Sequence, residues 1–239
     1  MKADVNTSGL QRLQPFLIVG GALEGIEATL CNSSTWAEGL TDSLPPMREN
    51  EVARVTKLRD SDVAKRLRDS LVCGRVMLGE RLGLSAHEVC ITRSSEGAPQ
   101  LENRLETSVS ISRSGNWTLV ALGDGRAIGA DVEVMRTLDW RVMLGMVCNE
   151  PEAKAFLAFA EREPDQTLRA FFTLWTIKEA VLKATGRGMR AGAKSVAVSV
   201  DDLVSRVQPL REIEVAGTVY TVWSGWEVDV ALSLAIARD

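Results

Sequence analysis

The stretch SVSISRSGNWTLVALGDGRAIGADVEV, residues 108–134, contains three strand-like runs separated by two short glycine-containing turns. The turns are Ser114-Gly115-Asn116 and Gly123-Asp124-Gly125, and turns of this composition connect antiparallel strands. The stretch therefore predicts a meander of strand, turn, strand, turn and strand. Its last strand ends at two carboxylates.

The two carboxylates are Asp131 and Glu133, and they lie on one predicted strand face. Apolar residues at 128, 130, 132 and 134 alternate with Gly129, Asp131 and Glu133. Alternate residues of a strand project from the same face, roughly 7 Å apart. That spacing suits a shared ion or a bound pyrophosphate. By itself this pattern is also common on a solvated strand face.

A third carboxylate, Glu179, lies in WTIKEAVLK, where the periodicity becomes helical. Leu168, Phe172, Trp175 and Leu182 recur with Glu179 at helical steps, so the carboxylate falls on an otherwise apolar face and needs a partner. Lys183, four residues on, is close enough to pair with Glu179 or to reach a phosphate. Asp131, Glu133 and Glu179 thus come from two distant segments that we expect to converge on one hard cation.

The rest of the chain predicts helices and strands in both halves. We expect helices in SLPPMRENEV, in residues 61–82 with a stop at Gly83, twice within 137–166, and in 167–186. We expect one or two strands in 16–32, a short strand in VCITRS, a loop in SSEGAPQLENR, and strands in VAVSV, TVYTVW and WEVDVALSLAIA. This predicts an α+β protein of two similarly built lobes, residues 1–124 and 125–239.

Composition excludes several classes of site and of protein. The 239 residues are 45% hydrophobic and 25% charged, which is typical of a soluble globular protein. No run of 18 apolar residues and no signal peptide occurs, so we expect a cytoplasmic protein without a membrane segment. Four scattered cysteines and one histidine, His87 in a predicted loop, argue against a zinc site, a disulfide framework or a Ser/His/Asp triad.

Charge is unevenly distributed along the chain. The formal net charge of −4 argues against general nucleic-acid binding. Between Arg48 and Arg75, however, eight basic residues stand against five acidic ones. This segment is either a solvated helix face with ordinary ion pairs or a surface for a phosphorylated ligand or an acidic partner.

Taken together, these motifs resemble the 4′-phosphopantetheinyl transferase superfamily of the two-lobed Sfp type. The resemblance is carried by SISRSGNWTLVAL, IGADVE, NEPEAKAF and WTIKEAVLKATGRG, and more loosely by the basic helix from Arg54 through Arg75. It covers most of the chain. It implies two α/β lobes related by pseudo-twofold symmetry, with coenzyme A in the cleft between them.

The resemblance also implies roles for individual residues. Asp131, Glu133 and Glu179 would form the magnesium site, with Asp131, Glu179 and Lys183 as the catalytic groups. The groups expected near coenzyme A are Lys178 and Lys183 at the phosphates, Ser112 and Arg113 at the nucleotide, and Arg54 and Arg66 in the basic helix.

The implied reaction is a magnesium-dependent transfer of 4′-phosphopantetheine from coenzyme A to a serine of an acyl or peptidyl carrier protein. Two departures from the family pattern touch the expected 3′-phosphate pocket: Ser112-Arg113 replaces the usual Ser-His, and Gly97-Ala98-Pro99 replaces the usual Gly-Lys-Pro. Arg113 offers a permanently charged fork in place of the histidine. Arg93 or Arg66 would offset the missing lysine if the fold brings them close.

Two alternatives stay open at the level of sequence. One is a non-catalytic module that binds carrier proteins or coenzyme A on the same fold. The other is a magnesium-dependent transferase that uses another pyrophosphate donor. The two-lobed form predicts a monomer, because similar halves satisfy internally what a symmetric oligomer would provide.

Overall fold

The computed structural model describes residues 11–13, 23, 25–38, 45–102, 104, 106–186, 192–201, 203 and 210–238. Much of the predicted strand region 16–32 and the segment after Gly186 lie outside these residues.

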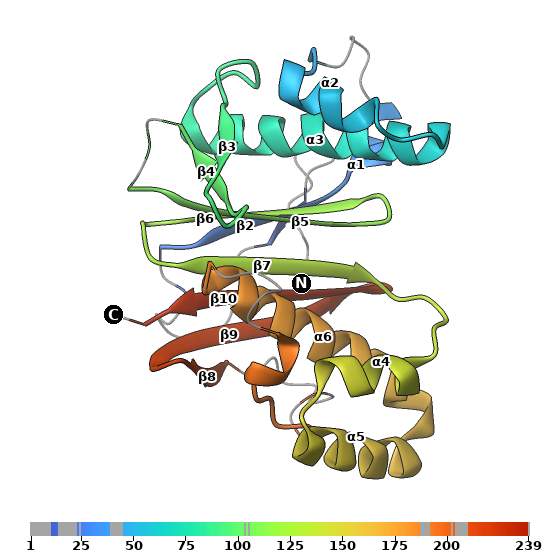
Figure 1. Ribbon diagram of the computed structural model, residues 1–239. Helices are drawn as coiled ribbons and strands as arrows, with labels where there is room; N and C mark the ends of the chain where they lie inside the picture. The colour runs from blue at the N-terminus through green and yellow to red at the C-terminus, as the bar shows by residue number, and fades with distance from the viewer. Residues whose placement is uncertain are drawn as a thin grey trace.

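The N-terminal half contains an antiparallel four-stranded sheet and three helices (Figure 1). Its strands are β1 (Gln11–Leu13), β2 (Glu27–Asn32), β5 (Ser108–Ser114) and β6 (Trp117–Gly123), in the order β1-β2-β6-β5. The helices are α1 (Ser33–Glu38), α2 (Glu49–Val55) and α3 (Ser61–Leu82). A separate hairpin, β3 (Ile91–Arg93) with β4 (Pro99–Leu101), lies between α3 and β5 in sequence.

The C-terminal half has a second antiparallel sheet, with the order β7-β10-β9-β8. Its strands are β7 (Ile128–Val134), β8 (Arg211–Val215), β9 (Thr218–Glu227) and β10 (Val230–Ala237). Its helices are α4 (Trp140–Val147), α5 (Glu150–Arg162) and α6 (Thr167–Ala184), with short 3-10 turns at Pro164–Gln166 and Ala193–Ser195.

The two halves repeat one topology. In the first half, β2, α3, β5 and β6 occur in this order along the chain, and the three strands lie in the sheet in the order β2-β6-β5. In the second half, β7, α6, β9 and β10 occur in the corresponding order, and the strands lie in the order β7-β10-β9. The outer strands differ, because β1 pairs with β2 whereas β8 pairs with β9. The α+β class is confirmed. The boundary at 124/125 stays a prediction, and it falls in the turn between β6 and β7.

The helix predicted over 61–82 is confirmed at both ends. The Asp60 carboxylate caps α3 by accepting hydrogen bonds from the backbone N–H groups of Asp62 and Val63, at 2.9 and 3.0 Å. Gly83 ends the helix with φ +66°, a left-handed conformation that favours glycine.

Apolar side chains form three buried clusters that set the layers. One lies under α3 on the N-terminal sheet, and another lies around α4, α5 and α6. The third lies between the two sheets: β2 and β6 contribute one side, and Ile128, Ala130 and Val132 of β7 contribute to the other. Figure 1 shows the sheets stacked, with α1–α3 beyond one sheet and α4–α6 on the other. The lobes therefore share a core.

Several local predictions were wrong or incomplete. SSEGAPQLENR contains strand β4, and β1, α1 and β8 were not expected. VAVSV, residues 196–200, is not a strand. Its valines are buried alternately, but its backbone bonds to side chains: the Val198 N–H donates to Glu152 Oε1 at 2.7 Å, and the Val196 carbonyl accepts from Lys178 Nζ. The alternation of buried valines therefore led to a wrong strand prediction.

In the described part of the chain, no helix is both long and apolar enough to span a membrane. The four cysteines are free thiols, and Cys31, Cys73 and Cys148 are buried. His87 is exposed in the turn that follows α3.

Candidate active site

Strand β7 carries Asp131 and Glu133 on one face, as the alternation predicts. Its other face, with Ile128, Ala130 and Val132, is buried between the two sheets. Asp131 is only 4% exposed, whereas Glu133 is half-buried nearer the end of the strand. The apolar face thus fixes the strand and leaves the two acids toward α6.

Helix α6 lies directly against the acid-bearing face of β7 because residue 129 is glycine. A Cβ at Gly129 would overlap the carbonyl oxygen of Ala180 on α6. This close approach sets Glu179 and Lys183, one helical turn apart, beside the β7 carboxylates. Both side chains are half-buried, while their helical neighbours Ala180 and Leu182 are fully buried.

Lys183 connects the helix to both lobes. Its Nζ donates hydrogen bonds to Asp131 Oδ1 at 2.7 Å, to Ser112 Oγ at 2.8 Å and to the Ala130 carbonyl at 3.0 Å. The Ser112 hydroxyl, from β5, donates in turn to Asp131 Oδ1 at 2.7 Å. The lysine, the aspartate and the serine therefore form one hydrogen-bonded group between the sheets.

The carboxylates are close enough to influence one another's ionisation. Burial raises the pKa of Asp131, and Lys183 and Ser112 oppose that rise. Burial also raises the pKa of Glu179, and the negative charges of Asp131 and Glu133 add to it. Excess negative charge thus accumulates where β7 and α6 meet; we call Asp131, Glu133 and Glu179 the acidic centre.

The acidic centre does not form a ready metal cage. Across the described residues, no group of three or more Asp, Glu, His or Cys side chains is arranged to hold a metal ion. Instead Lys183 pairs with Asp131 Oδ1, and Glu133 Oε2 accepts from Ser114 Oγ at 2.7 Å and from Arg136 at 3.1 Å. Asp131 Oδ2, however, is buried and has no hydrogen-bond partner among the described residues.

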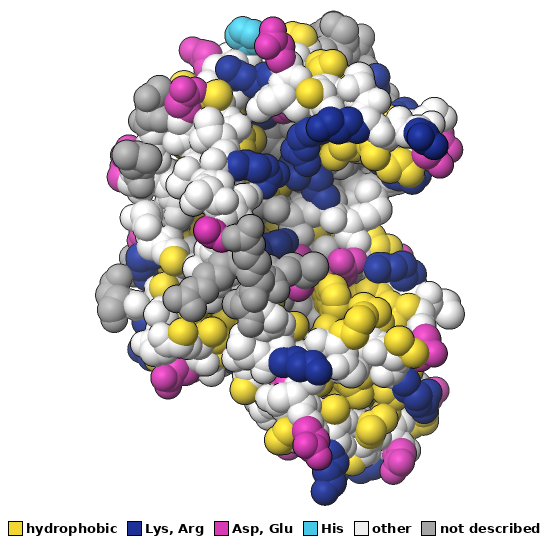
Figure 2. All heavy atoms as spheres, viewed as in Figure 1, with side chains coloured by type: hydrophobic (Ala, Val, Ile, Leu, Met, Phe, Trp, Pro, Cys, Tyr) yellow, Lys and Arg dark blue, Asp and Glu magenta, His cyan; other side chains and the backbone are white. Residues whose placement is uncertain are grey.

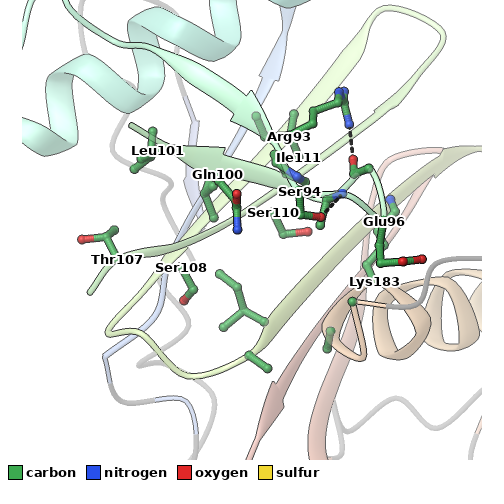
Figure 3. Close-up of a pocket in the computed structure, with 18 of the residues that line it drawn as sticks. Arg93, Ser94, Glu96, Gln100, Leu101, Thr107, Ser108, Ser110, Ile111 and Lys183 are labelled. Atoms are coloured by element: carbon green, nitrogen blue, oxygen red, sulfur yellow. Dashed lines mark hydrogen bonds between the residues drawn. The ribbon is translucent and has the colours of Figure 1, made fainter. Parts of the chain in front are cut away.

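Beside the acidic centre is a hollow of about 650 Å³ between the β3–β4 hairpin, β5 and the end of α6. Lys183 and residues 184–186 line one side of it, and residues 93–101 line the other. Figure 3 shows Ser108, Ser110 and Lys183 around this hollow, with Arg93 above it. Its volume lies within the range usual for small-molecule sites.

A second hollow, of about 310 Å³, adjoins the first and shares Arg93, Pro99 and Ile111 with it. Its lining is strongly basic; the arginines are Arg48, Arg54, Arg75, Arg93 and Arg113. We call it the arginine hollow. Figure 2 shows Lys and Arg side chains gathered on the upper part of this face, where α2 and α3 lie in Figure 1.

Positive charge in the arginine hollow is only partly neutralised. Its one acidic lining residue, Glu51, bonds to Arg75 Nε at 2.9 Å. Among the described residues, Arg54, Arg93 and Arg113 form no ion pair. Burial, with the nearby charges of Arg54 and Arg93, lowers the pKa of Arg113 to about 10, and its buried Nε has no hydrogen-bond partner there. Such a hollow favours an anion.

Most of the predicted site residues are brought to these two regions. Lys183, Ser112 and the three acids meet at the junction of β5, β7 and α6, and Arg54 and Arg113 line the arginine hollow. Arg93 also lines it, so the fold supplies a cation near Ala98, where the family's lysine is missing.

Two predicted residues lie elsewhere. Lys178 was expected at a phosphate, but it is 1% exposed and bonds to both oxygens of Glu152, at 2.9 and 2.8 Å. It faces the opposite side of α6, toward α5 and residues 193–196. Arg66 is exposed on α3 and lines neither hollow.

Sequence reasoning missed two kinds of site residue. Arg48 lines the arginine hollow, held there by hydrogen bonds from its Nη1 to the carbonyls of His87 and Val89, at 2.9 and 2.8 Å. The sequence showed that Arg48 belongs to the basic segment, but it did not show where the side chain points. Ser110 and Ser114 of β5 contact β7, and their alternation with Ser112 is the signal that marks them.

Comparison with known proteins agrees with this architecture. Residues 127–231 match the family model described as the 4′-phosphopantetheinyl transferase superfamily. This segment contains Asp131, Glu133, Glu179 and Lys183.

Curated relatives carry the same name. The chain is 33% identical over 160 residues to the 4′-phosphopantetheinyl transferase HetI of Nostoc sp., covering 63% of this chain and 64% of HetI. It is 32% identical over 135 residues to AcpT of Salmonella typhimurium, covering 56% of this chain and 65% of AcpT. Each match spans less than two thirds of the relative's own length. Over residues 127–231 the chain is therefore similar to the 4′-phosphopantetheinyl transferase superfamily.

Proposed function

We propose that this protein transfers the 4′-phosphopantetheine group of coenzyme A to a serine hydroxyl of an acyl or peptidyl carrier protein, releasing adenosine 3′,5′-bisphosphate. The observation that carries the proposal is that the larger hollow connects the acidic centre with the arginine hollow. Lys183, which is bonded to Asp131, lines the larger hollow, and the two hollows share part of their lining. Coenzyme A carries a pyrophosphate and a separate 3′-phosphate, so it offers one group to each region. A cytoplasmic location and a monomeric state stay predictions.

The arginine hollow is suited to the 3′-phosphate. Arg54, Arg93 and Arg113 have no carboxylate partner among the described residues, so a phosphate would not have to displace one. Arg113 presents the planar fork that binds phosphate oxygens in pairs. The shared lining of the two hollows lets one ligand extend from the arginines toward Lys183.

The acidic centre fits Mg²⁺ by its chemistry, although its side chains are not gathered around an ion. Its donors are carboxylate oxygens, which Mg²⁺ prefers, and Asp131 Oδ2 lacks a partner. The raised pKa values of Asp131 and Glu179 support this proposal, because added positive charge would stabilise both carboxylates. Asp131, Glu133 and Glu179 would hold the ion, which would neutralise charge on the pyrophosphate oxygens.

Glu179 is the proposed general base. Its raised pKa brings it nearer to the operating pH, where a carboxylate accepts a proton more effectively. It takes the proton of the carrier serine as the serine oxygen bonds to the β-phosphorus. The bond from that phosphorus to the bridging oxygen breaks, and the electron pair leaves with adenosine 3′,5′-bisphosphate.

Lys183 is the proposed partner of the leaving group. Its ammonium lies between the acidic centre and the larger hollow, which it also lines. There it stabilises the charge that develops on the departing phosphate. Ser112 and Asp131 orient Lys183, because each binds its Nζ within 2.8 Å. Positioning and electrostatics supply most of the rate in phosphoryl-type transfer.

Intact-mass measurement of carrier proteins tests the proposal. The protein is mixed with coenzyme A, magnesium and a panel of apo carriers, and parallel reactions contain a chelator or dephospho-coenzyme A. We expect one phosphopantetheine to be added, only with magnesium, and strongly reduced addition from the dephospho donor. No addition to any carrier by the folded protein would contradict the proposal. Equal use of both donors would instead favour a different pyrophosphate donor.

A further inference from the structure

The two sheets are joined at one edge by serines rather than by backbone pairing. Strands β5 and β7 belong to different sheets. The three alternate serines of β5, which we call the serine seam, all bond to residues of β7; they are Ser110, Ser112 and Ser114. Alternate residues point to one side of a strand, so the seam presents three hydroxyls to the other lobe.

The three serines make different contacts. Ser110 Oγ accepts a hydrogen bond from the Ala130 N–H at 2.9 Å and contacts no carboxylate in the described structure. Ser112 belongs to the group around Lys183 already described. Ser114 Oγ accepts from the Val134 N–H at 3.1 Å and donates to Glu133 Oε2 at 2.7 Å.

The contacts of Ser114 fix the direction of its hydroxyl. A serine hydroxyl has one proton and turns freely unless its oxygen is engaged. Here the Val134 N–H engages that oxygen, so the proton is directed at Glu133. The other donor to Oε2, Arg136, is 60% exposed, and an exposed ion pair restrains a carboxylate weakly.

We propose that Ser114 is a positioning residue for Glu133. This inference rests on the proposed function. By holding Oε2 against β5, it leaves Oε1, which accepts no hydrogen bond from the described residues, as the oxygen offered to a cation. The N-terminal lobe thereby sets the orientation of a carboxylate that belongs to the C-terminal lobe. Partners of this kind typically change metal affinity by about 10- to 100-fold.

The seam supplies its own matched control. S110A and S114A each remove a hydrogen bond from a β7 backbone N–H, that of Ala130 or of Val134, but only S114A also removes a hydrogen bond to a carboxylate. A purely structural role would make the two variants alike. S114T keeps a hydroxyl at the same position, and S114C keeps only a weak donor.

Mn²⁺ binding, read from the electron paramagnetic resonance signal of the free ion, tests the inference on the full chain without carrier protein. We expect the Mn²⁺ Kd of S114A to rise about tenfold, that of S114C to rise less, and those of S114T and S110A to stay within about twofold of the original protein. In chelator, S114A and S110A should unfold at similar temperatures.

The outcomes separate this inference from the proposed function. If the original protein modifies carriers and binds Mn²⁺, but S114A binds it as tightly as S110A does, the positioning role is wrong and the proposed function stands. Equally weakened Mn²⁺ binding in S110A and S114A would also overturn the inference, because the loss of any contact between β5 and β7 would then explain the effect. If the original protein neither binds Mn²⁺ nor modifies carriers, both proposals fail. Should S114A not fold, unchanged binding by S114C would overturn the inference.

Discussion

The acidic centre and the arginine hollow are built in opposite ways. At the acidic centre three carboxylates face Lys183 and the exposed Arg136, and burial with mutual repulsion raises the pKa values of Asp131 and Glu179. In the arginine hollow five guanidinium groups share one carboxylate, and burial with repulsion lowers the pKa of Arg113. Each region retains charge of one sign.

A buried pair elsewhere shows how the same fold treats charges that need no ligand. Lys178 and Glu152 are 1% and 7% exposed, and they satisfy each other with two hydrogen bonds. Uncompensated buried charge is costly, whereas a paired and hydrogen-bonded charge is tolerated. The difference teaches that the two unbalanced regions, and not the balanced pair, are where charged ligands are expected.

The largest expected effect comes from the proposed base. Glu179→Ala should lower kcat for carrier modification by about 10²- to 10⁴-fold, the usual contribution of a general base. Glu161→Ala, at an exposed position of α5, is the matched control and should leave the rate unchanged. Steady-state kinetics with intact-mass detection measures both, and full activity in Glu179→Ala would show that the acidic centre is not catalytic.

Breaking the balanced pair should affect stability first. Lys178→Met leaves Glu152 buried without its cation, at a cost of about 3 kcal/mol or more. For a protein of this length, that lowers Tm by roughly 6 to 12 °C. Lys154→Met, at an exposed site, should change Tm little.

Lys178→Met also tests whether Lys178, unlike Lys183, is structural and does not contact a phosphate. Differential scanning calorimetry and coenzyme A binding are measured on the same samples. An unchanged Tm with weakened coenzyme A binding would return Lys178 to the phosphate role that the sequence predicts.

The arginine hollow gives a smaller, ligand-specific effect. Arg113→Ala removes a charge-assisted contact, which is expected to weaken coenzyme A binding by about 10- to 100-fold. Dephospho-coenzyme A should bind equally to the original protein and to Arg113→Ala. The control Arg66→Ala should bind coenzyme A normally, because Arg66 lines neither hollow. Calorimetric titration distinguishes these cases; equal losses for both ligands would place the 3′-phosphate elsewhere.

The smallest effect is a gain in stability. Burial raises the folded-state pKa of Glu179, so the charged form destabilises the fold as pH rises through that pKa. Glu179→Gln imitates the protonated form. In chelator it should raise Tm by a few degrees at neutral pH, and the gain should disappear at acidic pH, where Glu179 is protonated. Thermal scans across pH check this, and a Tm lowered at neutral pH would contradict it.

Much of the site was predictable because it depends on local periodicity. The β7 alternation placed Asp131 and Glu133 on one face, and helical spacing placed Lys183 beside Glu179. The limits of α3 followed from Gly83 and from apolar spacing. In each case the information lies within a few residues along the chain.

What could not be predicted depends on neighbours that are distant in sequence. Lys178 and Lys183 are five residues apart, which is about 140° around a helix, and only the placement of α5 and β7 decides which lysine is buried. Arg48, directly before α2, and Arg93, at the end of β3, line one hollow because of how these two elements pack together, which sequence alone does not show. The alternation of 110, 112 and 114 was visible, but the strand that it contacts was not.

Calorimetric binding of coenzyme A and dephospho-coenzyme A, each with magnesium and with chelator, tests the central claim most directly. The claim is that the acidic centre and the arginine hollow bind different charged groups of one ligand. We expect loss of the 3′-phosphate to weaken binding about 10- to 100-fold with or without magnesium, and chelation to weaken both ligands by a similar factor. Equal affinity for the two ligands, or binding that chelator leaves unchanged, would contradict it.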